Sequence, residues 1–137
     1  MYKKGIYKIV ANSPLTRDVY RMVLEGDTQW IMRPGQFVNI ELDGLYLRRP
    51  ISICDWDEKT ITIIYKVVGR GTEIMSQMQA GEKLDVLTGL GNGFSTTAAT
   101  ECPVLVGGGV GVPPLYNLAK KLKAAGKRVQ VVLGFNR

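Results

Sequence analysis

Short apolar runs separated by turn-forming residues fill the first ninety positions of the chain. In one run Val38, Ile40 and Leu42 alternate with polar residues, and alternation with period two is typical of half-buried β-strands. The pattern predicts six strands, at Gly5–Ala11, Val19–Glu25, Phe37–Leu42, Arg48–Cys54, Thr60–Val67 and Leu84–Thr88. The connections between them are short turns, Asn12-Ser13-Pro14 among them. Six such strands favour an antiparallel barrel, because closure leaves no exposed sheet edge.

One short helix is expected between the fifth and sixth strands. Thr72 is a suitable N-cap residue and Gly81 a suitable stop. Between them Ile74, Met75 and Met78 fall on one helical face.

The pattern changes near residues 98–101, so we expect a boundary between a domain at 1–99 and an incomplete one at 100–137. Pro103–Val106 is a continuous apolar run, typical of a strand buried on both faces. A glycine-rich turn, a helix over Pro113–Ala125 and a second buried strand over Val129–Leu133 complete one β-α-β unit. Because such a unit leaves one sheet face and both edges open, we expect the chain to be the N-terminal part of a longer polypeptide.

The composition excludes several kinds of site. The chain has no histidine, which rules out Ser-His-Asp and Cys-His catalysis and histidine-containing zinc sites. Cys54 and Cys102 are too few for an iron–sulfur cluster, and we expect both to be buried apolar side chains. No apolar run approaches the roughly 18 residues that span a bilayer, and no secretion signal is visible. A cytoplasmic location without membrane contact is the expectation.

The formal net charge of +6 is unevenly distributed. Residues 1–101 carry twelve basic and twelve acidic residues, whereas the rest of the chain carries six basic residues and no acidic one. Five of the six lie on or just after the predicted second helix, without the interleaved aromatic residues that base stacking requires. The excess indicates a solvated helix face rather than a nucleic-acid partner. A non-catalytic barrel that binds nucleic acid or a partner protein is the alternative from another class.

Two segments of the predicted barrel place hydrogen-bond donors where a ligand could reach them. In Leu47–Ile53, Arg49 offers a planar fork of donors to a phosphate and Ser52 offers a hydroxyl. In Ile64–Thr72, a strand runs through Gly71 into a helix N-terminus, where free N–H groups attract anions. Taken alone, the first segment is more simply a strand with exposed arginines, and the second is equally well a plain turn before a helix.

Two glycine-containing segments follow. The turn at 107–111 lies between a strand and a helix, which is the context of a dinucleotide site. Its spacing is not G-x-G-x-x-G, and no acidic residue follows Glu101 to bind a ribose, so a tight turn is the alternative. Leu90–Phe94 contains Asn-Gly, which is first of all a turn signal.

Five segments follow one another along the chain: Pro34–Val38, Arg49–Ser52, Gly71–Thr72, Gly91–Phe94 and Gly107–Pro114. In this order they resemble the segments of the ferredoxin-reductase-type flavoproteins, in which a flavin-binding antiparallel barrel precedes a nicotinamide-nucleotide domain. Leu47–Ile53 and Leu90–Phe94 are most similar to the electron-transfer subunits of bacterial NAD-dependent dihydroorotate dehydrogenases. The resemblance implies FAD: residues 49–52 would contact the flavin ring and phosphates, 64–66 the ribityl and adenine side, and 71–72 the pyrophosphate. The cofactor-binding residues implied are Arg49, Pro50, Ile51, Ser52, Ile64, Tyr65, Lys66, Gly71, Thr72, Gly107, Gly108, Gly109 and Gly111.

The resemblance also implies a function. A flavin exchanges single electrons with an iron–sulfur cluster and a hydride with NAD, so no residue of this chain need be an acid, a base or a nucleophile. The expected partner is a catalytic subunit that oxidises dihydroorotate to orotate in pyrimidine biosynthesis. NAD and a [2Fe–2S] cluster are expected only in the full-length protein, and the chain alone is expected to be inactive.

One residue departs from the pattern of the resemblance. Ile51 stands where many such reductases have an aromatic residue, so apolar contact would replace ring stacking there. The alternative within the same build is the flavin subunit of a ferredoxin:NADP oxidoreductase or of a sulfide dehydrogenase.

Overall fold

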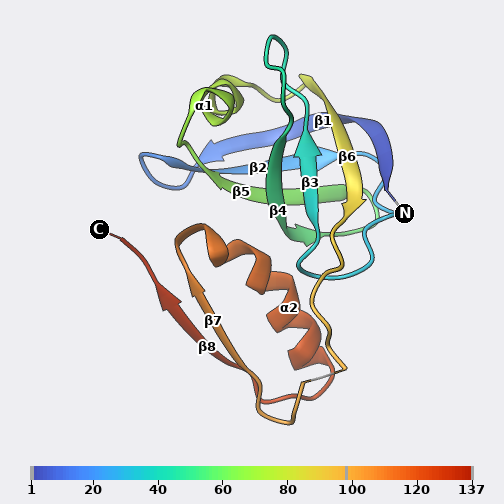
Figure 1. The fold of residues 1–137 in the computed structure, drawn as a ribbon, viewed down its shortest axis with the longest axis vertical. Helices are drawn as coiled ribbons and strands as arrows, with labels where there is room; N and C mark the ends of the chain where they lie inside the picture. Colours follow the sequence, from blue (N-terminus) through green and yellow to red (C-terminus); the bar gives the residue numbers. More distant parts are fainter. Residues whose placement is uncertain (1, 98, 137) are drawn as a thin grey trace.

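The computed structural model describes residues 2–97 and 99–136, which form a barrel and a smaller α/β unit (Figure 1). The barrel strands are β1 (Lys3–Pro14), β2 (Val19–Glu25), β3 (Phe37–Ile40), β4 (Arg49–Trp56), β5 (Thr60–Lys66) and β6 (Lys83–Leu90). They close in the order β1-β2-β5-β4-β3-β6, and every neighbouring pair is antiparallel. The predicted six-stranded antiparallel barrel is confirmed.

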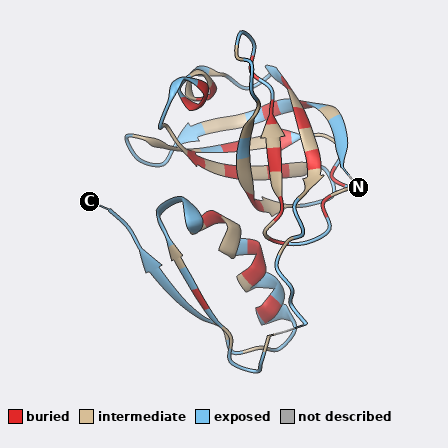
Figure 2. Ribbon diagram, viewed as in Figure 1, coloured by how far each residue is buried: buried red, intermediate tan, exposed pale blue. Residues whose placement is uncertain are grey.

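The barrel core comes from the inward-facing residues of all six strands. Along β5, for example, Ile61, Ile63 and Tyr65 are buried, while the residues between them are only half-buried. Figure 2 shows this alternation as buried bands on the strands. Each large aliphatic side chain removed from water contributes about 1.5–3 kcal/mol, so the hydrophobic interior is the main stabilising element.

The predicted turn at Asn12-Ser13-Pro14 is wrong, because β1 continues to Pro14 and pairs with β2 there. The position of Asn12 in this strand lets its side chain make three hydrogen bonds. Its Nδ2 donates to the carbonyls of Met75 at 2.8 Å and Met78 at 2.9 Å, and its Oδ1 accepts from the Tyr65 hydroxyl at 2.9 Å. Asn12 therefore fastens the end of the first helix to the barrel.

Helix α1 (Arg70–Gln77) differs at both ends from the helix expected between Thr72 and Gly81. The N-cap is Gly69, and the Thr72 hydroxyl accepts the N–H groups of Val68 and Gly69 from inside the first turn. The predicted apolar face is confirmed, since Met75 is fully buried and its neighbours on that face pack on the barrel core.

The second unit contains β7 (Val104–Gly108), the 3₁₀ turn η1 (Gly109–Gly111), α2 (Pro113–Ala124) and β8 (Gln130–Gly134). The two strands are parallel, as the predicted β-α-β unit requires. Leu105 packs on Leu118 and Leu122 of α2. The prediction that both strands are buried is wrong: Val106 is 72% exposed and all of β8 is exposed, because α2 covers only one face of the pair (Figure 2).

The two cysteines differ in environment. Cys54 lies buried in β4, as predicted, and burial raises the pKa of its thiol. The prediction for Cys102 is wrong, because this residue is exposed just before β7, where no layer covers it.

Polar contacts join α2 to β4. The Asp55 carboxylate accepts hydrogen bonds from Asn117 Nδ2 at 2.7 Å and from Lys120 Nζ at 2.9 Å. The Lys121 ammonium lies 5.1 Å from the centre of the Trp56 ring, within cation–π range. Although burial opposes the charged form of Asp55, these donors hold the pKa of its carboxyl below the ordinary value. Part of the basic charge of α2 thus serves to attach the second unit to the barrel.

Candidate functional site

The barrel wall is split between β4 and β5. The two strands pair only from Ile53 to Trp56 on β4 and from Ile61 to Ile63 on β5, and beyond these residues no pairing joins them. The part of β4 that leaves the ladder is Arg49–Ser52, and the part of β5 is Ile64–Lys66. The structure therefore places these two segments, both of which were predicted to bind the cofactor, on the two sides of one opening. Backbone N–H and C=O groups without a sheet partner need another one, which a bound ligand can supply.

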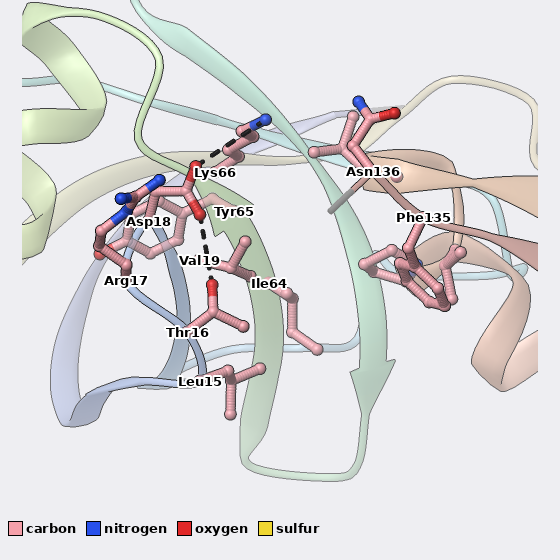
Figure 3. A pocket seen from close by; sticks show the side chains of 14 residues that line it. Leu15, Thr16, Arg17, Asp18, Val19, Ile64, Tyr65, Lys66, Phe135 and Asn136 are labelled. Atoms are coloured by element: carbon pink, nitrogen blue, oxygen red, sulfur yellow. Dashed lines mark hydrogen bonds and ion pairs between the residues drawn. The ribbon is translucent and has the colours of Figure 1, made fainter.

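A cleft of about 760 Å³ lies beside this opening, between the barrel and the second unit. Its lining comes from the turn between β1 and β2, the end of β5, the η1–α2 turn and the segment after β8. The lining residues are Leu15, Thr16, Arg17, Asp18, Val19, Ile64, Tyr65, Lys66, Gly109, Val110, Val112, Pro113, Phe135 and Asn136; Figure 3 shows their side chains. A volume of this size is ordinary for a small-molecule or cofactor site.

The three predicted residues of β5 take different positions. Ile64 and Lys66 are half-buried on the outer face of the strand, which is the face toward the cleft. Tyr65 is 2% exposed, its ring stacks on Tyr20, and its hydroxyl donates to Asn12. Burial raises the pKa of Tyr65 to about 12. The Tyr65 side chain therefore belongs to the barrel interior.

A second group of predicted residues meets at the start of α1. A Cβ atom built on Gly71 would lie 2.3 Å from Arg49 Nε, so the arginine side chain occupies the space that a larger residue would fill. The first N–H groups of a helix have no acceptor within the helix. Arg49 and the N-terminus of α1 thus present a guanidinium and free backbone donors to the same region, an arrangement suited to a phosphate group.

The Thr72 side chain shapes the backbone of this region. Its hydroxyl donates to the Gly69 carbonyl at 3.1 Å besides accepting the two N–H groups that precede the helix. These bonds fix the turn through which β5 enters α1. The N-terminus of α1 is thereby held a few residues beyond Lys66, which ends β5 and lines the cleft.

The neighbouring arginine, Arg48, has a different role from Arg49. It donates to the Asp85 carboxylate at 2.8 Å and to the backbone carbonyls of Asn39 and Asp85 at 3.2 Å. These contacts tie the start of β4 to β3 and β6. The arginine pair in the sequence therefore divides into one residue that binds the barrel and one that faces Gly71.

The remaining predicted residues of β4 lie along the split. Pro50 is exposed and stands opposite Asn39 of β3, and its ring has no N–H to leave unpaired. Ile51 is half-buried against the core, and Ser52 stands opposite Phe37. None of the three lines the cleft. They can therefore contact a flavin ring, as predicted, only if the ring lies in the opening between β4 and β5.

The glycine turn lies only partly at the cleft. Gly109 lines it and has a φ of +55°, a conformation that favours glycine. Gly107 allows close packing instead, since a Cβ there would lie 2.6 Å from a methyl group of Leu115. Gly108 and Gly111 do not line the cleft. Their predicted part in nucleotide binding stays a prediction.

Leu90–Phe94 makes structural contacts. The Phe94 N–H donates to the Pro34 carbonyl at 2.7 Å, and Gln36 Nε2 donates to the Gly91 carbonyl at 3.0 Å. A Cβ on Gly35 would lie 2.7 Å from the Phe94 ring. The segment thus packs against the turn before β3, which explains its glycine content without a ligand.

Sequence reasoning missed the turn that connects β1 with β2. The residues at 15–18 and Phe135 line the cleft, but they belong to no recognisable motif. The pairing of β1 with β2 up to Pro14 brings this turn to the end of β5. Only the three-dimensional register of the strands reveals it.

Curated relatives share much of the sequence, although the chain matches no protein-family model. The chain is 45% identical over 140 residues to the electron transfer subunit of dihydroorotate dehydrogenase B (NAD(+)) from Enterococcus faecalis strain V583, covering 97% of this chain and 53% of the relative. It is 44% identical over 133 residues to the subunit of that name from Fusobacterium nucleatum, covering 91% of the chain and 51% of the relative. The chain spans about half the length of the curated relatives it matches. The resemblance predicted from the sequence is confirmed.

Solved structures share the fold. An NADH-dependent reduced ferredoxin-NADP oxidoreductase studied for flavin-based electron bifurcation superposes with a TM-score of 0.85 at 33% identity, over 96% of this chain and 49% of that one. Phthalate dioxygenase reductase gives a TM-score of 0.77 at 24% identity over 96% and 43% of the two chains. A ferredoxin NADP+ reductase from Neisseria gonorrhoeae with bound FAD and NADP gives 0.79 at 17% identity, over 96% and 57%. The last two show the ferredoxin-reductase fold alone.

Two further findings concern the described residues as a whole. Neither α1 nor α2 is long and apolar enough to cross a membrane. Among the described residues, no three His, Cys, Asp or Glu side chains gather into a group that could hold a metal ion.

Proposed function

We propose that this chain is the FAD-binding part of an electron-transfer subunit of the kind found in bacterial NAD-dependent dihydroorotate dehydrogenases. The observation that carries the proposal is the split between β4 and β5, which exposes two predicted cofactor-binding segments on either side of one opening. The relatives named above support the choice of subunit.

The residues at the site fit FAD. Arg49 and the N-terminus of α1 would hold the pyrophosphate, because the region offers a guanidinium and helix N–H groups and has room only while residue 71 lacks a side chain. The split would hold the flavin ring, with backbone groups of β4 and β5 facing its heteroatoms. The cleft would hold the remainder against the apolar side chains of Leu15 and Ile64.

Bound FAD supplies the chemistry, because a flavin exchanges electrons singly with an iron–sulfur centre and in pairs, as hydride, with a nicotinamide. The chain binds and orients the group. The β4–β5 opening would expose one edge of the ring while the barrel covers the rest, and the second unit would shield the cleft from water. None of the residues that line the cleft needs to give up or take a proton.

The whole protein would bind more than FAD. We expect the glycine turn beside α2 to approach NAD, and a [2Fe–2S] cluster to lie in sequence outside this chain. We also expect a cytoplasmic complex with a subunit that oxidises dihydroorotate to orotate. The support is the naming of the relatives, of which the chain spans about half.

A second candidate is an NADH-dependent ferredoxin-NADP oxidoreductase. The structural relative of that kind matches at 33% identity and a TM-score of 0.85, so the same flavin-binding framework would serve either enzyme. Co-purification of the full-length protein with a subunit that reduces its flavin when given dihydroorotate supports the first candidate. Reduction of the flavin by NADH and exchange of electrons with reduced ferredoxin, without response to dihydroorotate, supports the second.

Titration of the purified 137-residue chain with FAD tests the flavin-binding claim that both candidates share. We expect saturable 1:1 binding with quenching of flavin fluorescence and a structured visible absorption band. A chain that leaves the FAD spectrum and fluorescence unchanged, and instead retards RNA in a gel, contradicts the proposal and supports a nucleic-acid-binding barrel.

A further inference from the structure

One carboxylate faces the cleft from the turn between β1 and β2. The Asp18 side chain accepts a hydrogen bond from the Thr16 hydroxyl at 3.3 Å and lies 3.9 Å from Lys66 Nζ (Figure 3). Its backbone carbonyl accepts the Val67 N–H at 2.8 Å. The turn is therefore joined to the end of β5, and Asp18 is fixed at the place where β5 enters the cleft.

The Asp18 carboxylate has acceptor capacity to spare. An ionised carboxylate offers about four lone-pair positions. Within the described residues its side chain makes the hydrogen bond to Thr16 and the ion pair with Lys66, and it is 44% exposed. Among the residues that line the cleft it is the single acidic one. Among the described residues that line the cleft, Asp18 alone offers a carboxylate to a ligand that needs a strong acceptor.

The second unit lacks the acceptor that its glycine turn calls for. In dinucleotide-binding folds an acidic residue about 20 positions after the glycine turn accepts a hydrogen bond from a ribose hydroxyl. No Asp or Glu follows Glu101 in this chain. Gly109 nevertheless lines the same cleft as Asp18, so the barrel brings a carboxylate to the space beside the glycine turn.

We infer that Asp18 binds the ribose hydroxyls of the adenosine half of a dinucleotide lying in the cleft. The vicinal diol of the ribose would donate to the free lone pairs of the carboxylate, while the Lys66 ammonium beside it faces a phosphate. The ligand class is an ADP-ribose compound, either FAD or NAD. The inference deepens the proposed function and rests on it.

The charge of Asp18 makes the site selective. A ribose that carries a 2′-phosphate would bring a second anion against the carboxylate, and like charges at such short range repel. Arg17 lines the cleft next to Asp18 in the sequence, but it does not remove the acceptor that a free diol requires. The chain is thus expected to bind ADP-ribose compounds more tightly than their 2′-phosphorylated counterparts.

The test is binding by Asp18→Asn, with Asp57→Asn as the matched control. Asp57 is also an aspartate of a hairpin turn, where it accepts N–H groups of Lys59 and Thr60, and it does not line the cleft. Dissociation constants are measured for FAD and FMN and for NAD and nicotinamide mononucleotide, so each dinucleotide has a partner without adenosine. An FAD analogue with 2′,3′-dideoxyadenosine removes the hydroxyls themselves.

Asp18→Asn should weaken FAD or NAD about tenfold and leave the matching mononucleotide within twofold, since a hydrogen bond to a charged group is stronger than one to a neutral group. Whichever dinucleotide responds is the one whose ribose Asp18 holds. If FAD is the ligand that responds, its dideoxy analogue should bind the original chain about tenfold more weakly than FAD does. The Asp18→Asn variant should bind FAD and the analogue with equal affinity. Asp57→Asn should change none of these constants.

Three results overturn the inference. In the first, both dinucleotides bind Asp18→Asn as tightly as the original chain while FAD still binds, which leaves the proposed function intact. In the second, FAD and FMN weaken equally, which means that Asp18 only shapes the turn. In the third, the original chain binds neither FAD nor NAD, and the proposed function falls together with the inference.

Discussion

Replacing Gly71 by alanine changes the candidate phosphate site while sparing the fold. The new methyl carbon would lie 2.3 Å from Arg49 Nε, where ordinary contact needs at least 3.4 Å, so the guanidinium must move by about 1 Å. Gly71 has no positive φ and lies in the first turn of α1, so alanine fits the backbone. Alanine in a helix is more favourable than glycine by up to about 1 kcal/mol, so the free energy of unfolding should stay the same or rise slightly.

Binding should respond very differently from stability. Hydrogen bonds tolerate donor–acceptor distances within about 0.5 Å, so a shift of the guanidinium by twice that distance breaks its bonds to a phosphate. A hydrogen bond to a charged group contributes about 1.5–3 kcal/mol. The dissociation constant for FAD should therefore rise roughly tenfold to 150-fold, because each 1.4 kcal/mol is a factor of about ten. Fluorescence titration measures the constant, and urea unfolding measures stability.

Gly69→Ala is the matched control for this substitution. Gly69 has extended backbone angles, and a Cβ there would meet no atom within 4 Å. It lies two positions away on the same segment, and its substitution should leave FAD affinity within twofold. The double variant Arg49→Ala/Gly71→Ala should bind no more weakly than Arg49→Ala alone if the alanine acts through Arg49. Equal FAD affinity in Gly71→Ala and the original chain would refute the assignment of the phosphate site.

Three further predictions concern stability and reactivity. Ile40→Ala leaves a cavity at a fully buried position of β3, and urea denaturation should show a loss of about 2–5 kcal/mol; a loss below 1 kcal/mol would contradict the packed barrel core. The lowered pKa of Asp55 means that its ion pair with Lys120 stabilises the fold fully above the unfolded-state pKa of ~4, and that this contribution is lost below that pH, as the pH falls through the lowered pKa of the folded state. Because Lys120 is half exposed, Asp55→Asn should cost no more than about 1 kcal/mol at pH 7 and should flatten the acid limb of a pH–stability curve, and an unchanged limb would count against the α2–β4 contact. Cys102 should react with a thiol reagent in the native protein and Cys54 only after unfolding, and equal native rates would mean that β4 is not buried.

The sequence predicts the barrel strands well because each strand is marked by the alternation of apolar and polar residues within its own few positions. Alternation along Phe37–Leu42 placed Val38 and Ile40 inside, and the structure buries both. The same counting on β5 puts Tyr65 in phase with Ile61 and Ile63, so its burial could have been found from the sequence. The N-cap of α1 could not, because Thr72 can cap from outside the helix or bond back from its first turn, and only the path of the preceding glycines decides.

Features that depend on distant neighbours escaped the sequence reasoning. A continuous apolar run such as Pro103–Val106 indicates that a strand needs cover on both faces, but the burial it reaches depends on what lies against it. The turn at 15–18 enters the cleft only because β2 pairs with β5 next to it. The split between β4 and β5 is likewise a property of register, although the residues along it were identified from their chemistry.

The structure of the chain with FAD bound is the most direct test of the account. We predict that a crystal soaked or grown with saturating FAD shows the pyrophosphate against the Arg49 guanidinium and the N–H groups of the first turn of α1, with the flavin ring in the opening between β4 and β5. FAD bound at another place, with Arg49 still over Gly71 and the opening empty, would contradict it.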